Sequence, residues 1–362
     1  MAGVTDRLNK YAPPARAVDW SILGCVLLAT GSGLYSFTVG RPDGYGWLWV
    51  RGHRVIGLTL LGLLAFKLAR VRRRLTDTDR WQRSTALSVA TALIALATLA
   101  TGIVWGFTGL VWIAVWPLLA VHVGLGLLLV PLVFAHMATR FRLPRRRDVA
   151  QRRTALKYFG LLAAGGLAAR LGDAFVRAAD APGANRRFTG SKPAEGDGNS
   201  SFPVTMWVAD DPDPVPPDAY ALTVDGLVDT PLEIDHDDLV GDPETTEEAL
   251  LDCTSGWYTV QEWGGVRIGT LLDTAGVDHE AAYVRFVSVT GYRWSLPIDE
   301  ARAALLATHV GAEALSHGHG APARLVAPGR RGFQWVKWVE RIEVRRNADP
   351  AQWLVTLVSG FD

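Results

Sequence analysis

The sequence predicts a two-part fold, in which an N-terminal all-α bundle of transmembrane helices precedes a C-terminal α+β domain. Long apolar segments with basic loops occupy the first half, whereas short strand-like segments and most of the acidic residues occupy the second half. A chain of 362 residues is long enough for two domains of ordinary size. We therefore expect residues 1–150 to form a four-helix transmembrane domain, residues 151–180 a fifth crossing, and residues 181–362 a separate exported domain.

Four segments of the first half are apolar and long enough to cross a bilayer, whose hydrocarbon core of about 30 Å requires about 20 helical residues. The four predicted spans and a shorter fifth one cover roughly residues 19–39, 45–67, 84–106, 111–137 and 158–177. The loops after the second and fourth spans are rich in arginine, which makes these loops and the N-terminus cytoplasmic by the positive-inside rule. Five crossings are an odd number, so the second half then lies on the outer side of the cytoplasmic membrane. Membrane lipid surrounds the predicted spans.

The start of the fifth span carries paired arginines, Arg152 and Arg153, followed by Leu156-Lys157 and a weakly hydrophobic stretch rich in glycine and alanine. This pattern resembles a twin-arginine export signal placed inside the chain. The alternative is the basic flank of an ordinary membrane anchor, but such an anchor would be richer in leucine and isoleucine. Because the twin-arginine route carries folded proteins, it would suit a domain that acquires a cofactor before export.

Three histidines lie within the predicted spans, where ionisable residues are costly and usually functional. His53 in the second span and His122 in the fourth lie at similar depths below the outer side. Two neutral imidazoles at matched depth on different helices can ligate one haem iron axially, so we predict one haem b bound by His53 and His122. His136 faces the same way as His122, but no other span offers a histidine near the cytoplasmic side, so a second haem is not expected. The alternative for His53 and His122 is a role in helix packing.

Charge and cysteine content narrow the possible functions. The 37 basic residues (Lys and Arg) nearly balance the 36 acidic residues (Asp and Glu), so net charge gives no reason to expect nucleic acid as a partner. Of the 2 cysteines, Cys25 lies in an apolar span and Cys253 in the polar half, which excludes a disulfide framework. Cys253 is therefore a lone thiol that requires its own explanation.

The second half begins after a linker at residues 178–200, which is rich in glycine, alanine and proline. Alternating or continuous apolar segments typical of strands cover residues 220–228, 282–290, 323–328 and 338–344, and short helices are expected at residues 271–275 and 298–308. Many strands with a few helices indicate an α+β fold. No internal repeat and no glycine-rich nucleotide-binding fingerprint is apparent.

Several motifs follow one another in this half of the chain. They are Asp252-Cys253-Thr254-Ser255-Gly256-Trp257, Glu262-Trp263-Gly264-Gly265-Val266, Leu271–Val277, Gly320–Pro328 and Gly332-Phe333-Gln334-Trp335-Val336-Lys337-Trp338. In this order they resemble the core of the molybdopterin-dependent sulfite oxidase family, and the resemblance covers about residues 188–346. Within that family the chain is most similar to the small bacterial exported reductases.

The resemblance implies a molybdenum–molybdopterin enzyme in which Cys253 is the catalytic metal ligand. Metal chemistry agrees, because a soft thiolate is the protein ligand that such a metal takes. The pterin phosphate is anionic and requires hydrogen-bond donors and positive charge. The residues that the resemblance places on the pterin and its phosphate are Lys337, Gly332, Phe333, Gln334, Arg324, Arg331, Ser191 and Asn199.

The expected function is oxygen-atom or electron transfer on a small sulfoxide-like or sulfite-like substrate, with electrons passing through haem b to or from membrane quinone or another redox partner. Thr254 and Ser255 stand beside Cys253, and the arginine-rich substrate pocket of true sulfite oxidases is not evident there, which puts sulfite itself in doubt. Two alternatives are an enzyme whose helices serve only as an anchor, with a separate electron partner, and a non-catalytic membrane-tethered binding module. The presence of Cys253 argues against the module.

Overall fold

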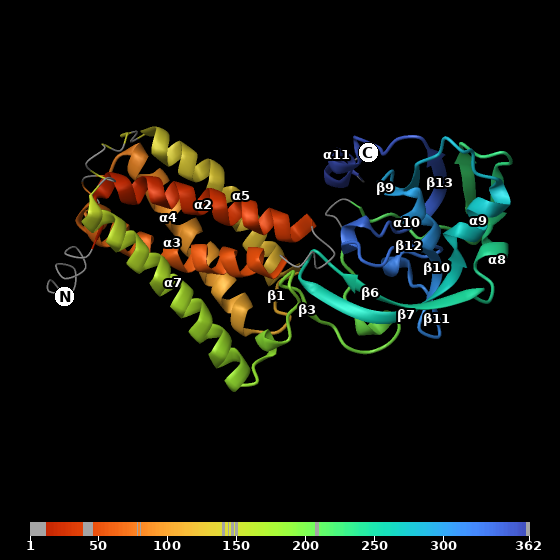
Figure 1. Ribbon diagram of the computed structural model, residues 1–362, viewed down its shortest axis with the longest axis horizontal. Helices are drawn as coiled ribbons and strands as arrows, with labels where there is room; N and C mark the ends of the chain where they lie inside the picture. Colours follow the sequence, from red (N-terminus) through yellow and green to blue (C-terminus); the bar gives the residue numbers. More distant parts are fainter. Residues whose placement is uncertain are drawn as a thin grey trace. The chain divides into compact units, whose positions relative to one another are not determined.

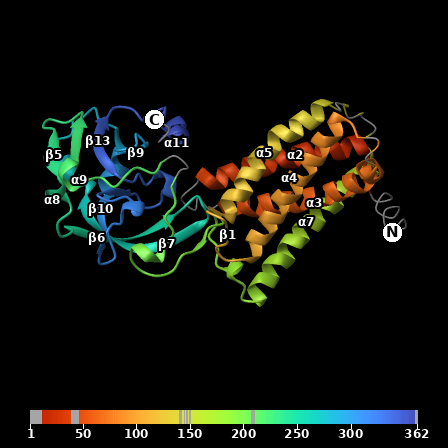
Figure 2. The same cartoon turned by 180° about the vertical axis from the view of Figure 1, so that it is seen from behind.

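A computed structural model describes residues 12–38, 46–77, 79, 81–139, 142–143, 145, 148, 151–206 and 210–359. The chain divides into two compact units, Met1–Lys192 and Pro193–Asp362. Figure 1 and its reverse view, Figure 2, show that the first unit consists of long helices and the second mainly of β-strands. The all-α bundle followed by an α+β domain is therefore confirmed. The finer predicted division at residues 150 and 180 stays a prediction.

Long helices build the first unit. They are α2 (Ala15–Thr38), α3 (Gly46–Thr76), α4 (Arg83–Phe107), α5 (Leu118–Thr139) and α7 (Arg152–Ala178). Among the described residues, α2, α4, α5 and α7 are long and apolar enough to cross a membrane, which supports a membrane protein. Leu28 is 62% exposed and Phe159 is 71% exposed, and such large apolar side chains on the outside of a bundle suit a lipid environment. Helix α3 is also long but carries several arginines, and its crossing stays a prediction.

The predicted fourth span is partly wrong, because its first residues are not helical. A two-stranded hairpin of β1 (Trp112–Ile113) and β2 (Trp116–Pro117) precedes α5, which begins at Leu118. Proline has no amide hydrogen to donate within a helix, and it is common at or near a helix start. Pro117 therefore marks where the apolar segment changes from hairpin to helix. In the predicted cytoplasmic loop that follows α5, Arg140, Arg146 and Arg147 lie outside the described residues.

The first sheet of the second unit is six-stranded and holds the turn on which Cys253 lies. Its strand order is β11-β10-β7-β3, with β12 also paired to β10 and β6 to β7. The strands are β3 (Lys192–Pro193), β6 (Thr245–Asp252), β7 (Trp257–Arg267), β10 (Leu305–Val310), β11 (Glu313–Ala314) and β12 (Arg324–Val326). Strand β6 pairs with β7 along its whole length, from Thr245 opposite Gly265 to Asp252 opposite Tyr258, so the turn between them is fixed at both ends.

The second sheet is five-stranded, in the order β5-β4-β13-β8-β9. Its strands are β4 (Ala221–Gly226), β5 (Leu232–Asp235), β8 (Tyr283–Ser288), β9 (Arg293–Pro297) and β13 (Val339–Arg345). In β8, Val284 and Phe286 are fully buried, while their neighbours are partly exposed, as expected for a strand with one face on the core. The four short helices of this unit are α8 (His236–Leu239), α9 (Ile268–Ala275), α10 (Ile298–Ala303) and α11 (Gln352–Val358).

The predicted helix at residues 298–308 is wrong in its second half. Helix α10 ends at Ala303, and Leu305–Val310 forms strand β10 between β7 and β12. A strand that is buried on both faces has a continuous apolar run, which periodicity cannot distinguish from a buried helix. The run Leu305-Leu306-Ala307 is such a case, since all three residues are fully buried.

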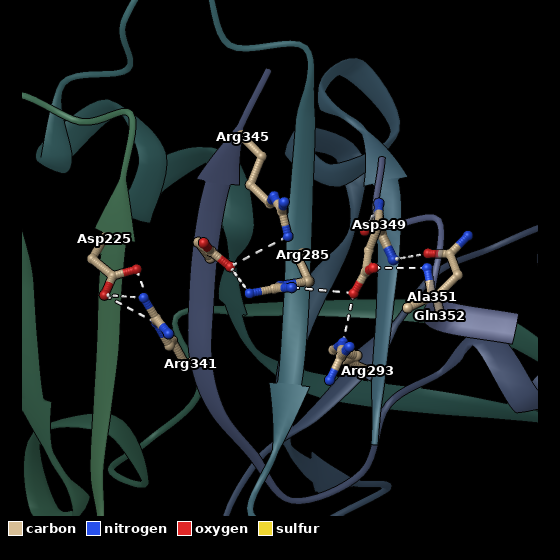
Figure 3. A network of polar contacts seen from close by, with 10 residues as sticks. Asp225, Arg285, Arg293, Arg341, Arg345, Asp349, Ala351 and Gln352 are labelled. Carbon is tan, nitrogen blue, oxygen red and sulfur yellow. Dashed lines mark hydrogen bonds and ion pairs between the residues drawn. The ribbon is translucent and has the colours of Figure 1, made fainter. Parts of the chain in front are cut away.

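A polar network ties the C-terminal segment to the second sheet (Figure 3). The carboxylate of Asp349 accepts hydrogen bonds from Arg293 Nε at 2.5 Å, from Arg285 Nη1 at 3.1 Å and from the Ala351 amide at 2.9 Å. Burial alone would raise the pKa of Asp349, but these donors together hold it below its ordinary value. On the neighbouring strands, Arg341 Nε lies 3.0 Å from both carboxylate oxygens of Asp225. The network fixes the segment that leads into α11.

Candidate active site around Cys253

Cys253 lies on the tight turn that joins β6 to β7. Its amide donates to the Trp257 carbonyl at 2.8 Å, and the Gly256 amide donates to the Cys253 carbonyl at 3.1 Å. Gly256 has a φ of 101°, a backbone conformation that only glycine adopts readily. The thiol is half-buried, with Sγ 2.8 Å from Ser255 Oγ and 3.2 Å from Thr205 Oγ1. The backbone therefore holds the cysteine in one position, and hydroxyl groups surround its sulfur.

The second group of motifs reaches the cysteine at a short 3₁₀ helix, η6 (Gly332–Gln334). A Cβ atom at Gly332 would lie 3.0 Å from the Cα atom of Cys253 and 3.2 Å from the Asp252 carbonyl oxygen. Both contacts are tight, and neither atom belongs to a flexible side chain. Only glycine lets this segment approach the cysteine turn so closely, which explains the glycine of the motif.

A fully buried ion pair joins the same two segments. The guanidinium of Arg331 contacts the carboxylate of Asp252, and both side chains are only 2% exposed. The backbones of these two residues also form an isolated parallel bridge. Arg331 Nη2 lies 3.5 Å from the Cys253 carbonyl oxygen. Arg331 thus positions the cysteine turn, and a direct contact with the pterin stays a prediction.

Arg324 places a buried positive charge near the cysteine. Its guanidinium donates to the His319 carbonyl at 2.9 Å and lies 5.0 Å from the ring centre of Trp263 and 5.8 Å from that of Trp335. Burial lowers the pKa of Arg324 to about 10, while the negative charge of Cys253 acts in the opposite direction. The arginine remains charged at neutral pH, so it is a fixed positive group for an anionic ligand.

Lys337 is a second cation of the site. Its ammonium donates to the carbonyls of Gly318 at 2.6 Å and Thr205 at 3.1 Å. The pKa of Lys337 is lowered to about 7, mainly by burial and also by the charge of Arg324, while the charges of Cys253, Asp210 and Asp211 act in the opposite direction. An anion bound here would favour the charged form of this lysine.

Buried donors without partners also surround these cations. Among the described residues, Arg324 Nε, Trp257 Nε1 and Trp335 Nε1 are buried donors that have no hydrogen-bond partner, and the His319 imidazole lies near them. Burial lowers the pKa of His319 to about 4, so its imidazole is neutral at physiological pH. Phe202 links two of these groups, with ring centres 4.2 Å from His319 and 5.6 Å from Trp257. Buried polar atoms normally have partners, so the donor set fits a large anionic group rich in acceptors, such as a molybdopterin.

The structure gives the remaining predicted pterin residues partners within the protein. Gln334 Oε1 accepts from the Arg331 amide at 3.0 Å, and the Phe333 ring packs on Trp294 at 5.1 Å. Asn199 donates through Nδ2 to Glu313 and Ala314 and accepts from the Ser316 amide, which ties it to the β10–β11 hairpin. Ser191 belongs to the first unit and is fully buried, with a hydrogen bond from Thr189 at 3.2 Å. Their pterin contacts stay predictions.

Three residues outside the predicted set of site residues also take part in the contacts around the cysteine. Thr205 contacts both Cys253 and Lys337, Asp252 pairs with Arg331, and His319 supplies the carbonyl that Arg324 binds. The position of Asp252 directly before the cysteine was the only signal for any of them, and a buried carboxylate needs a cation. Arg330, the neighbour of Arg331, pairs with Glu300 at 2.7 Å.

The predicted haem histidines meet in the first unit. His53 on α3 and His122 on α5 have ring centres 6.0 Å apart. His53 Nδ1 donates to the Ala29 carbonyl on α2, and His122 Nδ1 donates to the Thr98 carbonyl on α4, both at 2.9 Å. In each neutral imidazole this leaves the lone pair on Nε2 for a metal. No group of three or more His, Cys, Asp or Glu side chains suitable for a metal ion occurs among the described residues.

These features alone define a class of protein. It is a membrane protein whose α+β domain surrounds one cysteine with buried cations and buried donors, as an oxidoreductase with a metal cofactor requires. Residues 209–353 match the oxidoreductase molybdopterin binding domain family. The chain is 31% identical over 168 residues to the oxidoreductase YuiH of Bacillus subtilis, across 46% of this chain and 84% of that relative. The chain therefore belongs to the molybdopterin-dependent oxidoreductases of the sulfite oxidase family, and it is a molybdenum-cofactor enzyme.

Two further similarities cover smaller shares of this chain and of the matched protein. The catalytic subunit of the protein-methionine-sulfoxide reductase MsrP of Gluconobacter oxydans is 31% identical over 154 residues, or 37% of this chain. The chain spans about half of that relative, 49% of its length. The solved structure of the sulfane dehydrogenase SoxCD from Paracoccus pantotrophus is 31% identical over 38% of this chain and 40% of that chain, with a TM-score of 0.36.

Proposed function

We propose that this enzyme transfers an oxygen atom to or from a small sulfur compound at a molybdenum centre bound by the Cys253 thiolate. The observation that carries the proposal is that two buried cations, Arg324 and Lys337, interact with one half-buried cysteine in a domain that also holds buried donors without partners. When bound, the molybdenum cofactor supplies oxygen-atom transfer coupled to two-electron chemistry. The protein's part is to hold the thiolate in place and to supply donors to the pterin and its phosphate.

A sulfoxide is the substrate class that we favour, with reduction to the sulfide. In that reaction the sulfur–oxygen bond breaks, two electrons and two protons are consumed, and the oxygen leaves as water. The support is similarity to a relative named for methionine sulfoxide, together with the uncharged neighbours of the cysteine sulfur, Ser255 and Thr205. An oxyanion such as sulfite would favour a further cation at that point.

The electrons, in our proposal, pass between membrane quinone and the molybdenum centre through one haem b. Because a metal–imidazole nitrogen bond is about 2.0–2.1 Å long, two imidazoles on one iron have ring centres about 6 Å apart. The 6.0 Å between His53 and His122 agrees with that requirement, and their ring planes cross at 82°. The alternative remains an enzyme whose helices serve only as an anchor.

We also propose that the second unit is exported across the cytoplasmic membrane. The support is the sequence: arginine-rich loops on one side of the predicted spans and the paired Arg152 and Arg153 at the start of α7. In the structure α7 begins at this pair, in the order expected of a signal followed by its apolar segment.

Cofactor analysis of the purified full-length chain tests the proposal. Molybdenum, pterin and haem are measured per chain, and turnover is then measured with a dye donor and methionine sulfoxide, or with a dye acceptor and sulfite. We expect molybdenum, a reduced b-type spectrum, and faster turnover of the sulfoxide. Molybdenum with no haem would instead leave the helices as an anchor with a separate electron partner, and sulfite turnover without sulfoxide turnover would contradict the substrate class.

A further inference from the structure

The four helices around the two haem histidines repeat one arrangement twice. Helices α2 and α3 form the first hairpin, and α4 and α5 form the second. The apolar spans Ala15–Thr38 and Ser84–Phe107 are both 24 residues long, and an offset of 69 positions maps the first span onto the second. On this register His53 corresponds to His122.

Hydrogen bonds follow the same register. Ser32 Oγ lies 3.2 Å from His53 Nδ1, and its counterpart Thr101 Oγ1 lies 3.2 Å from His122 Nδ1; the partners are 21 positions apart in both cases. The accepting carbonyls, Ala29 and Thr98, precede their histidines by 24 residues in both hairpins. Helix packing alone does not fix such spacings, so four polar contacts on one register indicate a repeat.

The buried core of the bundle obeys the register as well. Its fully buried members form three counterpart pairs: Val26 and Ala95, Leu60 and Leu129, and Leu64 and Val133. On α3 and α5 these residues follow the histidines, so they form an apolar layer next to the proposed haem. The two hairpins therefore pack against each other as equivalent copies.

Beyond this layer the two copies differ. His136 follows His122 by 14 residues, nearly four helical turns, and lies about 21 Å further along the same face of α5. Its Nδ1 lies 3.2 Å from Ser88 Oγ on α4, the same contact that orients the two proposed haem ligands. In the first hairpin the counterparts of His136 and Ser88 are Lys67 and Asp19, which form an ion pair; both pairs are 48 residues apart.

We propose that the bundle consists of two copies of one hairpin with two symmetric haem positions, and that Lys67 with Asp19 closes the second position. This inference rests on the proposed haem at His53 and His122. A protonated lysine that is held by a carboxylate has no lone pair for iron, so the second position keeps one imidazole and lacks the other axial ligand. Placing the residues of the second hairpin, serine and histidine, at positions 19 and 67 should supply the missing ligand.

The test is the double variant Asp19→Ser with Lys67→His in the full-length chain, with haem per chain measured by the pyridine haemochrome assay. We expect one haem in the wild type, two in the double variant, and one again when His136→Ala is added. The matched control, Asp19→Ser with Lys67→Gln, removes the ion pair without adding a ligand and should keep one haem.

The outcomes separate the two claims. A wild type with one haem and a folded double variant with one haem would overturn the second position and leave the proposed haem intact. Two haems in the wild type would also overturn it, because Lys67 would then not close the position. A wild type with no haem would overturn both claims.

Discussion

Arg331 and Asp252 form a fully buried ion pair that connects the start of the Gly332–Gln334 segment to the residue before Cys253, the proposed metal ligand. Both charges are removed from water, and neither could remain there alone without a large cost. The pair therefore makes the geometry of the cysteine turn depend on the η6 segment, about 80 residues further along the chain.

Arg331→Met should destabilise the second unit by about 3–5 kcal/mol, because Asp252 would be left as an unpaired buried charge. Adding Asp252→Leu should recover much of that loss, since no charge then remains unpaired. The control is the exposed pair of Arg302 and Asp273, 2.6 Å apart, where Arg302→Met should cost less than about 1 kcal/mol. Urea unfolding followed by tryptophan fluorescence measures all three, and equal losses at both sites would contradict the argument.

Retention of the pterin should depend on pH through Lys337. The folded, cofactor-free chain holds the pKa of this lysine near 7, below its ordinary value of 10.5, mainly through burial. The unfolded chain therefore binds more protons between these values, so the stability of the cofactor-free protein rises with pH in that window. Binding of the anionic cofactor requires the charged lysine, so retention should instead fall as pH rises above about 7.

Two variants separate charge from shape at this position. Lys337→Ala should weaken retention by about 1.5–3 kcal/mol, the typical value of a charge-assisted hydrogen bond, and should remove the decline above pH 7. Lys337→Arg keeps the charge at all these pH values and should also remove the decline, with better retention than alanine. Pterin content after dialysis at a series of pH values is the measurement; an unchanged profile in both variants would rule out Lys337.

The haem proposal predicts a difference among three histidines. His53→Ala and His122→Ala should each abolish the b-type absorption bands, because each removes one axial ligand of the same iron. His136→Ala should leave the bands largely intact, and it is the matched control because it lies in the same helix as His122. Spectra of purified membranes decide the point, and bands that survive in the His53 variant would contradict the ligand pair.

Export predicts a role for the paired arginines that begin α7. Replacing Arg152 and Arg153 by lysine keeps the positive charge of the loop but removes the twin-arginine motif. The second unit should then remain in the cytoplasm and be protected from protease added to spheroplasts. Protease access equal to that of the wild type would exclude the twin-arginine route and leave the topology itself standing.

Sequence reasoning found the features of this protein that are local in the chain. The turn around Cys253 could be recognised because its geometry depends on neighbouring residues. The reason for the glycine at position 332 is different, since it lies in the close approach of the distant cysteine turn. The contact of Thr205 with Cys253 depends on a segment 48 residues away, and nothing in either segment indicates the other. The same holds for Arg331 and Asp252 until the fold brings them together.

Two features were not predicted correctly for a different physical reason, which is that one apolar residue can stand in for another. Leu305–Thr308, the first part of strand β10, was predicted as the end of a helix because a strand buried on both faces has no polar alternation. The hairpin repeat escaped notice because counterparts such as Val26 and Ala95 share burial but not identity. Only the polar contacts of the histidines, seen in the structure, reveal the register.

The central claim is that Cys253 binds the metal, and the paired measurement of turnover and cofactor content in Cys253→Ser tests it most directly. Serine offers a harder oxygen donor in nearly the same volume, while Lys337, Arg324 and the Gly332 segment are unchanged. Turnover with any substrate should fall to background, and the pterin should stay bound. A Cys253→Ser enzyme with full molybdenum and undiminished turnover would contradict the account.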